Sequence, residues 1–423
     1  MRVFEGKELS DDLSSFFDSG IYRLPGRGIV FVDPVRLLNA SYSHHRISAS
    51  GYYSRTFNSL ERRKDLEASD SSSSKKRKLK KRNNLELNKQ EIVSEKRHQE
   101  ARPVLLKAHE ALLGTVELIN FLPNLVKDEF SFNEVKGQNF VALGSLWQAP
   151  LYEISLCLDG SAILGEGLRH ESIGKKIVPL FNNVICNNTS DDMDAEFLNC
   201  RYVLPRKSSF CMSDLREIHD LIPGCSDQGF NLIVIDPPWE NGSAYQKAMY
   251  PTLPNRYFLY LPIKQLAHTN GALVVLWMTN RGKLRAFVDE ELFPAWGVTD
   301  VRTSYWLKVK PDGSLLGDLD LFHHRPYEYL LLGYVNKKKA EPLLDDQVFI
   351  SIPGAFSRKP PLGKLLADYV PGTKPWSCLE LFARDLVDGW TAWGNEPLRF
   401  QDSSYFVKRE QRQVVHEASE DYS

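Results

Sequence analysis

The residues best suited to chemistry form one short segment, in which an acid, two prolines and an indole follow the apolar run 232–235: Asp236, Pro237, Pro238 and Trp239. The prolines fix φ and remove two N–H donors, so this turn presents carbonyl oxygens as acceptors. Together with the Asp236 carboxylate, a prolyl carbonyl can hold both N–H donors of an exocyclic amine and orient its lone pair toward an electrophile. The Trp239 ring offers a face on which a purine can stack. This combination predicts a site that binds the amine of a purine base.

The amine of adenine is a poor nucleophile, because its lone pair is delocalised into the ring. Acceptor bonds favour the pyramidal nitrogen of the transition state. We therefore interpret Asp236 as an orienting acceptor and not as a base that must first remove a proton. The alternative is a plain turn that ends a strand, as Asp33-Pro34-Val35 illustrates elsewhere in the chain. Four matching residues at the end of an apolar run are much rarer than a bare Asp-Pro, which favours the active-site interpretation.

The elements that must position this segment alternate between strand-like and helix-like stretches after about residue 201. Strands are expected at 232–235, 272–277, 304–308, 329–334, 348–351 and 378–382, and helices near 283–292 and 362–369. Such alternation predicts an α/β fold with a mostly parallel, doubly wound sheet. Ligands of these sheets bind at the carboxyl ends of the strands, which is where Asp236 stands.

Five segments resemble, in order along the chain, the motifs of the MT-A70 family of adenine-N6 methyltransferases. They are residues 236–239, 276–281, 357–360, 380–384 and 393–396. The resemblance covers about residues 202–400. It implies a Rossmann-like methyltransferase sheet in which the catalytic motif precedes the cofactor motif, with S-adenosylmethionine as the cofactor.

The resemblance also implies which residues bind that cofactor. Lys359 would pair with the methionyl carboxylate, because a carboxylate ligand needs a cationic partner. The remaining residues are expected to line the cofactor cleft (Glu380 and Phe382), to reach the ribose hydroxyls (Arg384, Asn395 and Glu396) or to approach the adenine (Ser213 and Asp214). The chain departs from better-known relatives after Arg384, where Asp-Leu-Val replaces Pro-His-Asn, so cofactor contacts from Leu386 or Val387 are not expected. Glu396 stands where some relatives have Gln.

The sequence leaves several hypotheses for the substrate. The branch of the family that the chain resembles implies RNA, with an internal 2'-O-methylated adenosine of U2 small nuclear RNA as the target and N6,2'-O-dimethyladenosine as the product. DNA adenine is the alternative, since both substrates must expose the base. A catalytically silent subunit that binds RNA or a partner is a third reading, and methylation of a glutamine side chain a fourth, although that class usually carries Asn at the position of Asp236. Methyl transfer needs no metal, and the adjacent His323 and His324 would point to different sides of an extended chain.

Composition divides the chain into five parts: an N-terminal folded segment (1–54), a basic disordered linker (55–100), a middle region (101–200), the catalytic domain (201–407) and a charged tail (408–423). The linker carries seven basic residues among the eight at 75–82, which indicates a nuclear import signal or a nucleic-acid contact, the alternative being a solvated charge run. The middle region should open with an amphipathic helix over 103–121, with Pro103 in its first turn.

The remaining composition sets limits on the class of protein. The formal net charge is -1, so any basic surface must be local. The six cysteines form no C-x-x-C pair, which argues against a zinc finger or a disulfide framework. No segment has the length and apolarity of a signal peptide or a membrane helix, so we expect a soluble nuclear protein with no membrane partner. The oligomeric state is open, and a monomer is compatible with the sequence.

Overall fold

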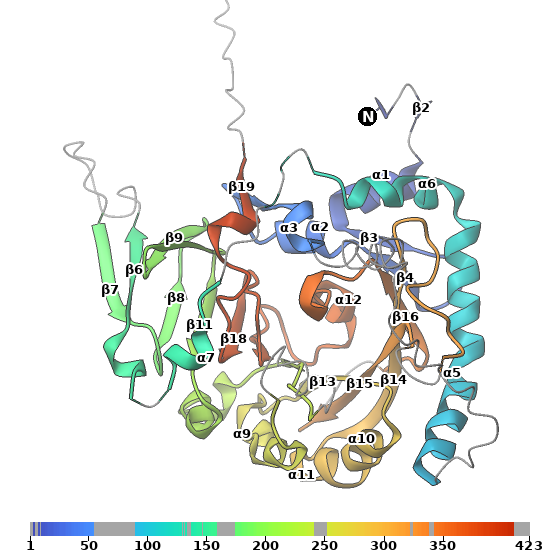
Figure 1. Ribbon diagram of the computed structural model, residues 1–423. Helices are drawn as coiled ribbons and strands as arrows, with labels where there is room; N and C mark the ends of the chain where they lie inside the picture. The colour runs from blue at the N-terminus through green and yellow to red at the C-terminus, as the bar shows by residue number, and fades with distance from the viewer. Residues whose placement is uncertain are drawn as a thin grey trace, which may run out of the picture.

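The computed structural model describes residues 3–4, 7–8, 10–54, 89–128, 130, 132, 137–145, 147–158, 174–240, 252–321, 325–337 and 342–409. An eleven-stranded mixed sheet crosses this part of the chain (Figure 1). In spatial order its strands are β3 (Ile21–Arg23), β4 (Ile29–Val32), β16 (Gln347–Ser351), β14 (Thr299–Lys308), β15 (Tyr327–Val335), β13 (Ala272–Met278), β12 (Leu232–Ile235), β17 (Cys378–Leu381), β18 (Trp390–Gly394), β11 (Ser208–Met212) and β8 (Val184–Asn187).

Most neighbouring strands of this sheet run parallel, which confirms the predicted fold class. Parallel pairing joins β4 to β16 and β16 to β14, and it continues from β13 through β12, β17 and β18 to β11. The strand β15 is antiparallel to both of its neighbours, and β3 and β8 are antiparallel edge strands. Because β12 lies between two parallel partners, the carboxyl ends of β13, β12 and β17 meet at one edge of the sheet.

Both faces of the central strands are buried, which explains their continuous apolar runs. Alternate residues of β12 and β13 enter two different cores: Ile233 and Val274 belong to one, Val234 and Val275 to the other. The helices that cover the sheet are mostly short: α1 (Asp11–Ser19), α2 (Pro34–Asn39), α3 (Ala49–Tyr52), α9 (Ile263–Leu266), α10 (Gly282–Phe287), the π-helical turn Val288–Leu292, α11 (Phe293–Trp296) and α12 (Gly363–Leu366). Among the described helices, none is long and apolar enough to span a bilayer.

The N-terminal segment is not separate from the catalytic domain, contrary to the predicted division at residue 54. Its strand β4 pairs in parallel with β16 and extends the central sheet, and β5 (His45–Ile47) pairs with the late strand β19 (Phe406–Lys408). At Asp33 the predicted turn is a helix cap, since its carboxylate accepts the backbone N–H of Val35 at 3.1 Å and opens α2. Strand pairing over more than 300 residues of sequence leaves no signal in local composition.

The predicted linker and helix boundaries were wrong near residue 100. A single helix, α5, runs over Lys89–Gly114 with Pro103 inside it, and α6 (Val116–Leu125) follows. The charged first half of α5 is held by fixed partners: Glu95 pairs with Arg325 at 2.6 Å and Arg102 with Asp320 at 2.7 Å. The charged residues of α5 therefore form ion pairs with the catalytic domain and are not part of a solvated linker. The basic run at 75–82, His323 and His324 all lie outside the described residues.

The middle region forms a second, four-stranded sheet on the opposite side of the molecule from α5 (Figure 1). Its strand order is β10 (Cys200–Leu204), β9 (Met193–Phe197), β6 (Glu153–Leu158) and β7 (Gly174–Pro179). The predicted boundary at residue 200 falls within the β9–β10 hairpin and is therefore wrong. A short helix, α7 (Phe140–Leu143), packs Phe140 into the core of this sheet.

Candidate active site

The Asp-Pro-Pro-Trp turn follows the last residue of β12 at the carboxyl edge of the sheet. Its backbone is fixed by two hydrogen bonds: the Trp239 N–H donates to the Pro237 carbonyl at 2.7 Å, and the Leu253 N–H donates to the Pro238 carbonyl at 3.0 Å. Both prolyl oxygens therefore accept one backbone donor already. A carbonyl oxygen has two lone pairs, so each retains capacity for one further donor.

The Trp239 side chain is mostly internal, with 8% of its surface exposed. Its indole N–H donates to the Trp277 carbonyl at 2.9 Å, and its ring packs edge-to-face on Phe258 with centroids 5.1 Å apart. These contacts anchor the turn to β13 and to the 3₁₀ helix η5 (Asn255–Tyr260). The ring still lines a cavity, and its stacking on a purine remains a prediction.

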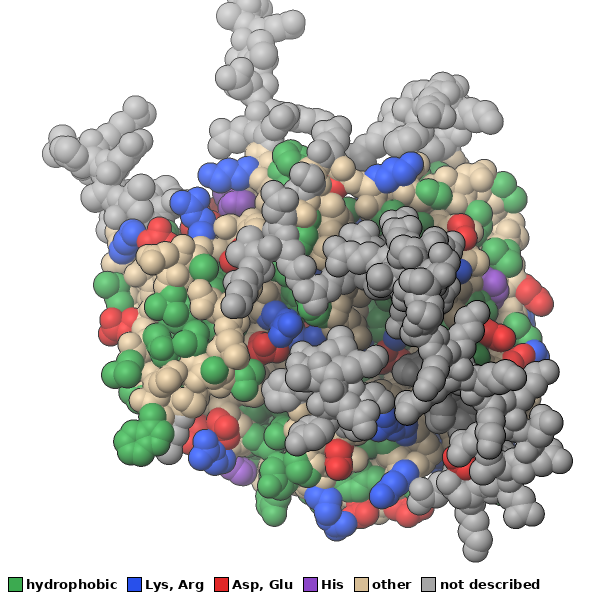
Figure 2. Space-filling view, in the orientation of Figure 1, with side chains coloured by type: hydrophobic (Ala, Val, Ile, Leu, Met, Phe, Trp, Pro, Cys, Tyr) green, Lys and Arg blue, Asp and Glu red, His purple; other side chains and the backbone are tan. Residues whose placement is uncertain are grey.

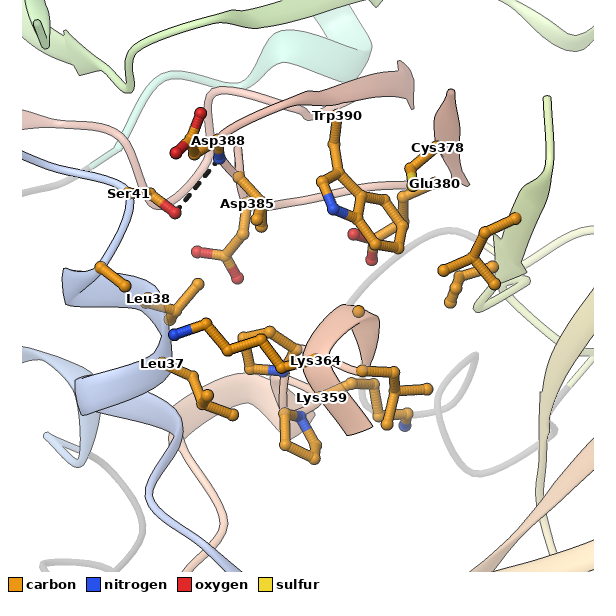
Figure 3. A pocket seen from close by; sticks show the side chains of 18 of the residues that line it. Leu37, Leu38, Ser41, Lys359, Lys364, Cys378, Glu380, Asp385, Asp388 and Trp390 are labelled. Atoms are coloured by element: carbon orange, nitrogen blue, oxygen red, sulfur yellow. Dashed lines mark hydrogen bonds between the residues drawn. The ribbon is translucent and has the colours of Figure 1, made fainter. Parts of the chain in front are cut away.

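Two cavities meet at Asp236. The turn cavity, of about 460 Å³, is lined by the Asp-Pro-Pro-Trp turn and by residues of the later motifs. The α2 cavity, of about 450 Å³, lies between α2, α12 and the face of the sheet that carries Val234 (Figure 3). Five residues line both cavities: Asp236, Trp277, Lys359, Phe382 and Arg384. Four of the five sequence motifs thus contribute to one shared wall.

A network of buried charges surrounds Asp236. The ammonium group of Lys359 lies 3.6 Å from Asp236 and donates to Glu328 at 2.8 Å, while Arg384 lies 4.0 Å from the second carboxylate oxygen of Asp236. Burial raises the pKa of Asp236, and the two cations partly oppose this rise. The pKa of Lys359 is raised despite burial, because Asp236 and Glu328 are both carboxylates. Lys359 is therefore held as a cation at the wall between the cavities.

Glu328 is a site residue that the motifs did not indicate. It lies at the start of β15, which runs antiparallel to β13, so its side chain reaches the carboxyl edge of the sheet beside the turn. Lys308 donates to one of its oxygens at 2.5 Å and Lys359 to the other at 2.8 Å. Burial alone would raise the pKa of Glu328, but the two ammonium groups lower it to about 2. In the sequence, Glu328 is marked only as an acidic residue at the start of an apolar strand.

Glu380 lines the α2 cavity, opposite Val234 in the register of β17 and β12. Figure 3 shows its carboxyl group in the same cavity as Lys359 and Asp385. Burial and the nearby carboxylates of Asp385 and Asp236 raise the pKa of Glu380 to about 8. This position is compatible with the predicted place of Glu380 in the cofactor cleft. With such a pKa, the carboxyl group takes up or loses a proton near neutral pH.

Phe382 and Arg384 follow the end of β17. Phe382 adopts a φ of 62°, and a Cβ built on Gly394 would lie 3.0 Å from its Cα. The Arg384 guanidinium donates to the carbonyls of Phe356 at 2.9 Å and Ser357 at 3.2 Å. Arg384 thus braces the 355–357 turn beside the turn cavity, in addition to any contact with a ribose.

The far end of the turn cavity is formed by Asn395, Glu396 and a residue from the middle region, Val141. The Glu396 carboxylate is fixed by Arg399 at 2.6 Å. Val141 belongs to α7, whose neighbouring Phe140 is anchored in the core of the four-stranded sheet. The sequence alone did not indicate Val141, because its approach depends on packing between two sheets.

Ser213 and Asp214 do not line either of these two cavities. The Ser213 hydroxyl donates to Asn182 at 2.9 Å, and the Asp214 side chain caps the 3₁₀ helix Leu215–Leu221 by accepting the Arg216 N–H at 3.0 Å. Both side chains thus have protein partners, and their approach to a cofactor adenine stays a prediction. Leu386 is buried in the core of the middle region, whereas Val387 lines the α2 cavity.

The chemistry of the turn cavity suits S-adenosylmethionine. The cofactor carries a carboxylate, vicinal hydroxyls and a sulfonium cation. The cavity offers the ammonium group of Lys359, the acceptors of Asn395 and Glu396, and the carboxylate of Asp236. Among the described residues, no group of three or more His, Cys, Asp or Glu side chains could hold a metal ion.

Comparison with known proteins places the same segment in one family. Residues 230–396 match the MT-A70 family model. The chain is 40% identical to the N(6)-adenine-specific methyltransferase METTL4 of Mus musculus over 243 residues, which cover 55% of this chain and 50% of the relative. It is 32% identical to the N6-methyladenosine RNA methyltransferase MTA1 of Pyricularia oryzae over 241 residues (54% and 61% of the two chains). It is 33% identical to a DNA N6-methyl methyltransferase of Caenorhabditis elegans over 224 residues (49% and 56%). The match thus spans half the length of the mouse relative.

Proposed function

Because the chain belongs to the MT-A70 family of adenine-N6 methyltransferases, we propose that it transfers a methyl group from S-adenosylmethionine to the N6 amine of adenosine in RNA. The observation that carries this proposal is the position of Asp236, at the end of β12 and in the wall shared by two cavities. The turn cavity brings the acceptors of the Asp-Pro-Pro-Trp turn and the candidate cofactor residues Lys359, Asn395 and Glu396 around this carboxylate.

In this mechanism the protein orients the amine. Asp236 accepts one N–H of the base, and the free lone pair of a prolyl carbonyl accepts the other, which directs the nitrogen lone pair toward the methyl donor. S-adenosylmethionine supplies an electrophilic methyl group on sulfur. As the N–C bond formed, the C–S bond of the donor would break and leave its sulfur as a neutral thioether. The methylated nitrogen would then have to lose a proton, which Asp236 can accept because burial raises the pKa of this group.

The charged residues around Asp236 have separate roles. Lys359 binds the cofactor carboxylate and, through Glu328, is fixed in position. Asn395 and Glu396 bind hydroxyl groups at the far end of the turn cavity, where Arg399 holds the Glu396 carboxylate. Around Lys359 and Glu328, burial of the side chains limits access of water, which strengthens their electrostatic contact.

RNA is favoured as the substrate by the likeness to the METTL4 branch, with an internal 2'-O-methyladenosine of U2 small nuclear RNA as the proposed target. The fungal relative, whose name describes an RNA methyltransferase, supports RNA as well. DNA adenine is the second candidate, because the nematode relative is named as a DNA methyltransferase and is equally similar to this chain. A silent binding subunit is disfavoured by the intact acid and the charged wall around it.

The protein is proposed to act in the nucleus, where small nuclear RNA resides. This proposal depends on the basic run at residues 75–82. Deleting that run from a fluorescent fusion of the full chain should shift the fusion out of the nucleus, while substitution of the catalytic Asp236 should not.

The test of the function is mass spectrometry of nucleosides after reaction of the purified full chain with isotopically labelled S-adenosylmethionine. Total RNA and total DNA from cells that lack the protein serve as parallel substrates. Labelled N6-methyladenosine or labelled N6,2'-O-dimethyladenosine in the RNA arm supports the proposal. Label confined to the DNA arm would replace it with the second candidate. The Asp236→Ala variant must lose whichever label the wild type gives.

A further inference from the structure

The 3₁₀ helix η5 presents two tyrosine rings to solvent directly beside the Asp-Pro-Pro-Trp turn. Tyr257 is 49% exposed and Tyr260 is 71% exposed. In a 3₁₀ helix the side chains at positions i and i+3 lie one above the other, so these two rings occupy the same face. Large apolar side chains that are scattered singly over a surface need no explanation, but a pair on one face next to a cavity does.

This helix is fixed to the active site at three points. The Leu253 N–H donates to the Pro238 carbonyl at 3.0 Å, just before the helix begins. The side chain of Asn255, its first residue, accepts the Glu240 N–H at 3.1 Å. Phe258 is fully buried between Trp239 and Phe382, with ring centroids 5.1 and 5.6 Å away. The residue between the two exposed rings thus packs against the catalytic turn, which fixes the rings relative to the turn cavity.

Cationic side chains accompany the two rings. Arg256 precedes Tyr257, and 75% of its side chain is exposed, although its guanidinium pairs with Glu291 at 2.9 Å. Arg281 lines the turn cavity and donates to the Glu240 carbonyl at 3.1 Å. Figure 2 shows hydrophobic side chains beside Lys or Arg side chains at the lower edge of the molecule, in the area of α9 and α11 in Figure 1. Two rings and one guanidinium group therefore lie on η5, and a second guanidinium group lines the turn cavity.

We propose that the face of η5 formed by Tyr257 and Tyr260, with Arg256 and Arg281 beside it, binds the nucleotides that flank the target adenine in a single strand. Nucleic acid without secondary structure is bound by aromatic rings on which successive bases stack and by cations that follow the phosphates. A face with both groups at the rim of a base-binding cavity has that composition. The inference rests on the proposed function, since flanking bases exist only if the substrate adenine belongs to a strand.

The experiment measures binding without the methylation reaction, so that it stays distinguishable from a test of the activity. The probes are fluorescein-labelled dodecauridylate and dodecathymidylate, which contain no adenine, and the readout is fluorescence anisotropy with the full chain. The double variant Tyr257→Ala/Tyr260→Ala should bind at least about tenfold more weakly than wild type, since each stacked base contributes about 1 to 3 kcal/mol. Comparison of the two probes shows whether the face prefers a ribose or a deoxyribose strand.

Two control variants separate stacking from other effects. The double variant Tyr257→Phe/Tyr260→Phe keeps both rings and should bind within about twofold of wild type. Trp147→Ala removes an indole that is 88% exposed in the middle region and should leave the affinity unchanged. Calorimetric titration of all variants with S-adenosylmethionine should match wild type, which shows that the cavity is intact.

Three outcomes would overturn the inference. They are that wild type binds neither probe measurably, that the Tyr257→Ala/Tyr260→Ala variant binds like wild type, or that Trp147→Ala weakens binding as much as the double variant does. In the first two cases the two rings would be assigned to another occupant, such as a protein partner. If the variants behave as expected but no adenine is methylated, the proposed function fails and the binding face stands.

Discussion

The ammonium nitrogen of Lys359 lies 3.6 Å from a carboxylate oxygen of Asp236. The same group donates to Glu328 at 2.8 Å, so one lysine serves the acid that we propose orients the amine and a second acid that the sequence motifs did not include. Lys359 can pair with a cofactor carboxylate only by sharing its donors among three acids. An ammonium group has three N–H donors, which makes this sharing possible. Cofactor binding and the charge of Asp236 are therefore coupled through Lys359.

We predict that Lys359→Ala and Asn395→Ala each weaken binding of S-adenosylmethionine by about 1 to 3 kcal/mol, the usual penalty when a polar or charged group of the bound ligand loses its partner. Lys359→Ala should also lower the free energy of unfolding, because Glu328 loses one of its two cations, whereas Asn395→Ala should not. Isothermal calorimetry measures the first quantity and urea denaturation the second. Wild-type titrations for both variants would remove these residues from the cofactor site.

Substitution of Asp236 by Ala should reduce turnover by a factor on the order of 100 to 10,000, the range for loss of one group that orients a reacting atom. The variant should remain folded and should still bind the cofactor, since Lys359 keeps Glu328 as a partner. Single-turnover kinetics with saturating S-adenosylmethionine isolate this effect. A folded variant with near-normal turnover would show that Asp236 does not act on the amine.

The sequence predicted Asp236 because its signal is local: a buried strand that ends in an acid and two prolines. It also predicted most of the sheet and the later motif residues, of which Lys359, Phe382, Arg384, Asn395 and Glu396 do line the turn cavity. Glu328 escaped prediction because its approach depends on the antiparallel pairing of β15 with β13. Long-range strand pairing and sheet-to-sheet packing are set by tertiary contacts, which leave no periodicity in a short window.

The predicted end of the basic linker was wrong for a related reason. Composition alone classed residues 89–100 as linker, but Glu95 and Arg325 form an ion pair across 230 positions of sequence. Ser213 and Asp214 show a different ambiguity, since Ser213 donates to Asn182 and Asp214 caps a 3₁₀ helix, while their predicted cofactor contacts stay untested. A polar residue at the end of a strand is therefore a candidate for a site and equally for a cap.

The pH dependence of stability should report on Glu380. Its pKa in the folded protein is about 8, above the ordinary value of 4.5, so the folded state binds more protons than the unfolded state between these values. The free energy of unfolding must then fall as pH rises through that window. Glu380→Gln removes this contribution, so wild type should lose stability relative to the variant between about pH 5 and pH 9. Urea midpoints that shift in parallel for both proteins would contradict the assignment.

The contribution of the middle region can be tested at Val141. Val141→Trp adds bulk to the far wall of the turn cavity, and we expect it to weaken S-adenosylmethionine binding by at least about tenfold, whereas Val141→Ala should cost about 1 kcal/mol through lost apolar contact. Ala142→Trp is the matched control, because Ala142 lies in the same helix but is exposed. Equal effects at positions 141 and 142 would indicate a disturbed α7 and not a cavity wall.

The substrate itself provides the last prediction. In matched single-stranded oligonucleotides of one sequence, kcat/KM should rank 2'-O-methyladenosine above adenosine and adenosine above deoxyadenosine. A shaped pocket can gain up to about 1 to 3 kcal/mol from one added methyl group, and deoxyadenosine lacks both the methyl group and the 2'-oxygen. The kcat/KM of deoxyadenosine falls below that of adenosine only if the protein contacts the 2'-oxygen. The order of adenosine and deoxyadenosine therefore reports that contact. Direct competition of the three oligonucleotides gives the ratios, and a preference for deoxyadenosine of tenfold or more would assign the protein to DNA with the same catalytic residues.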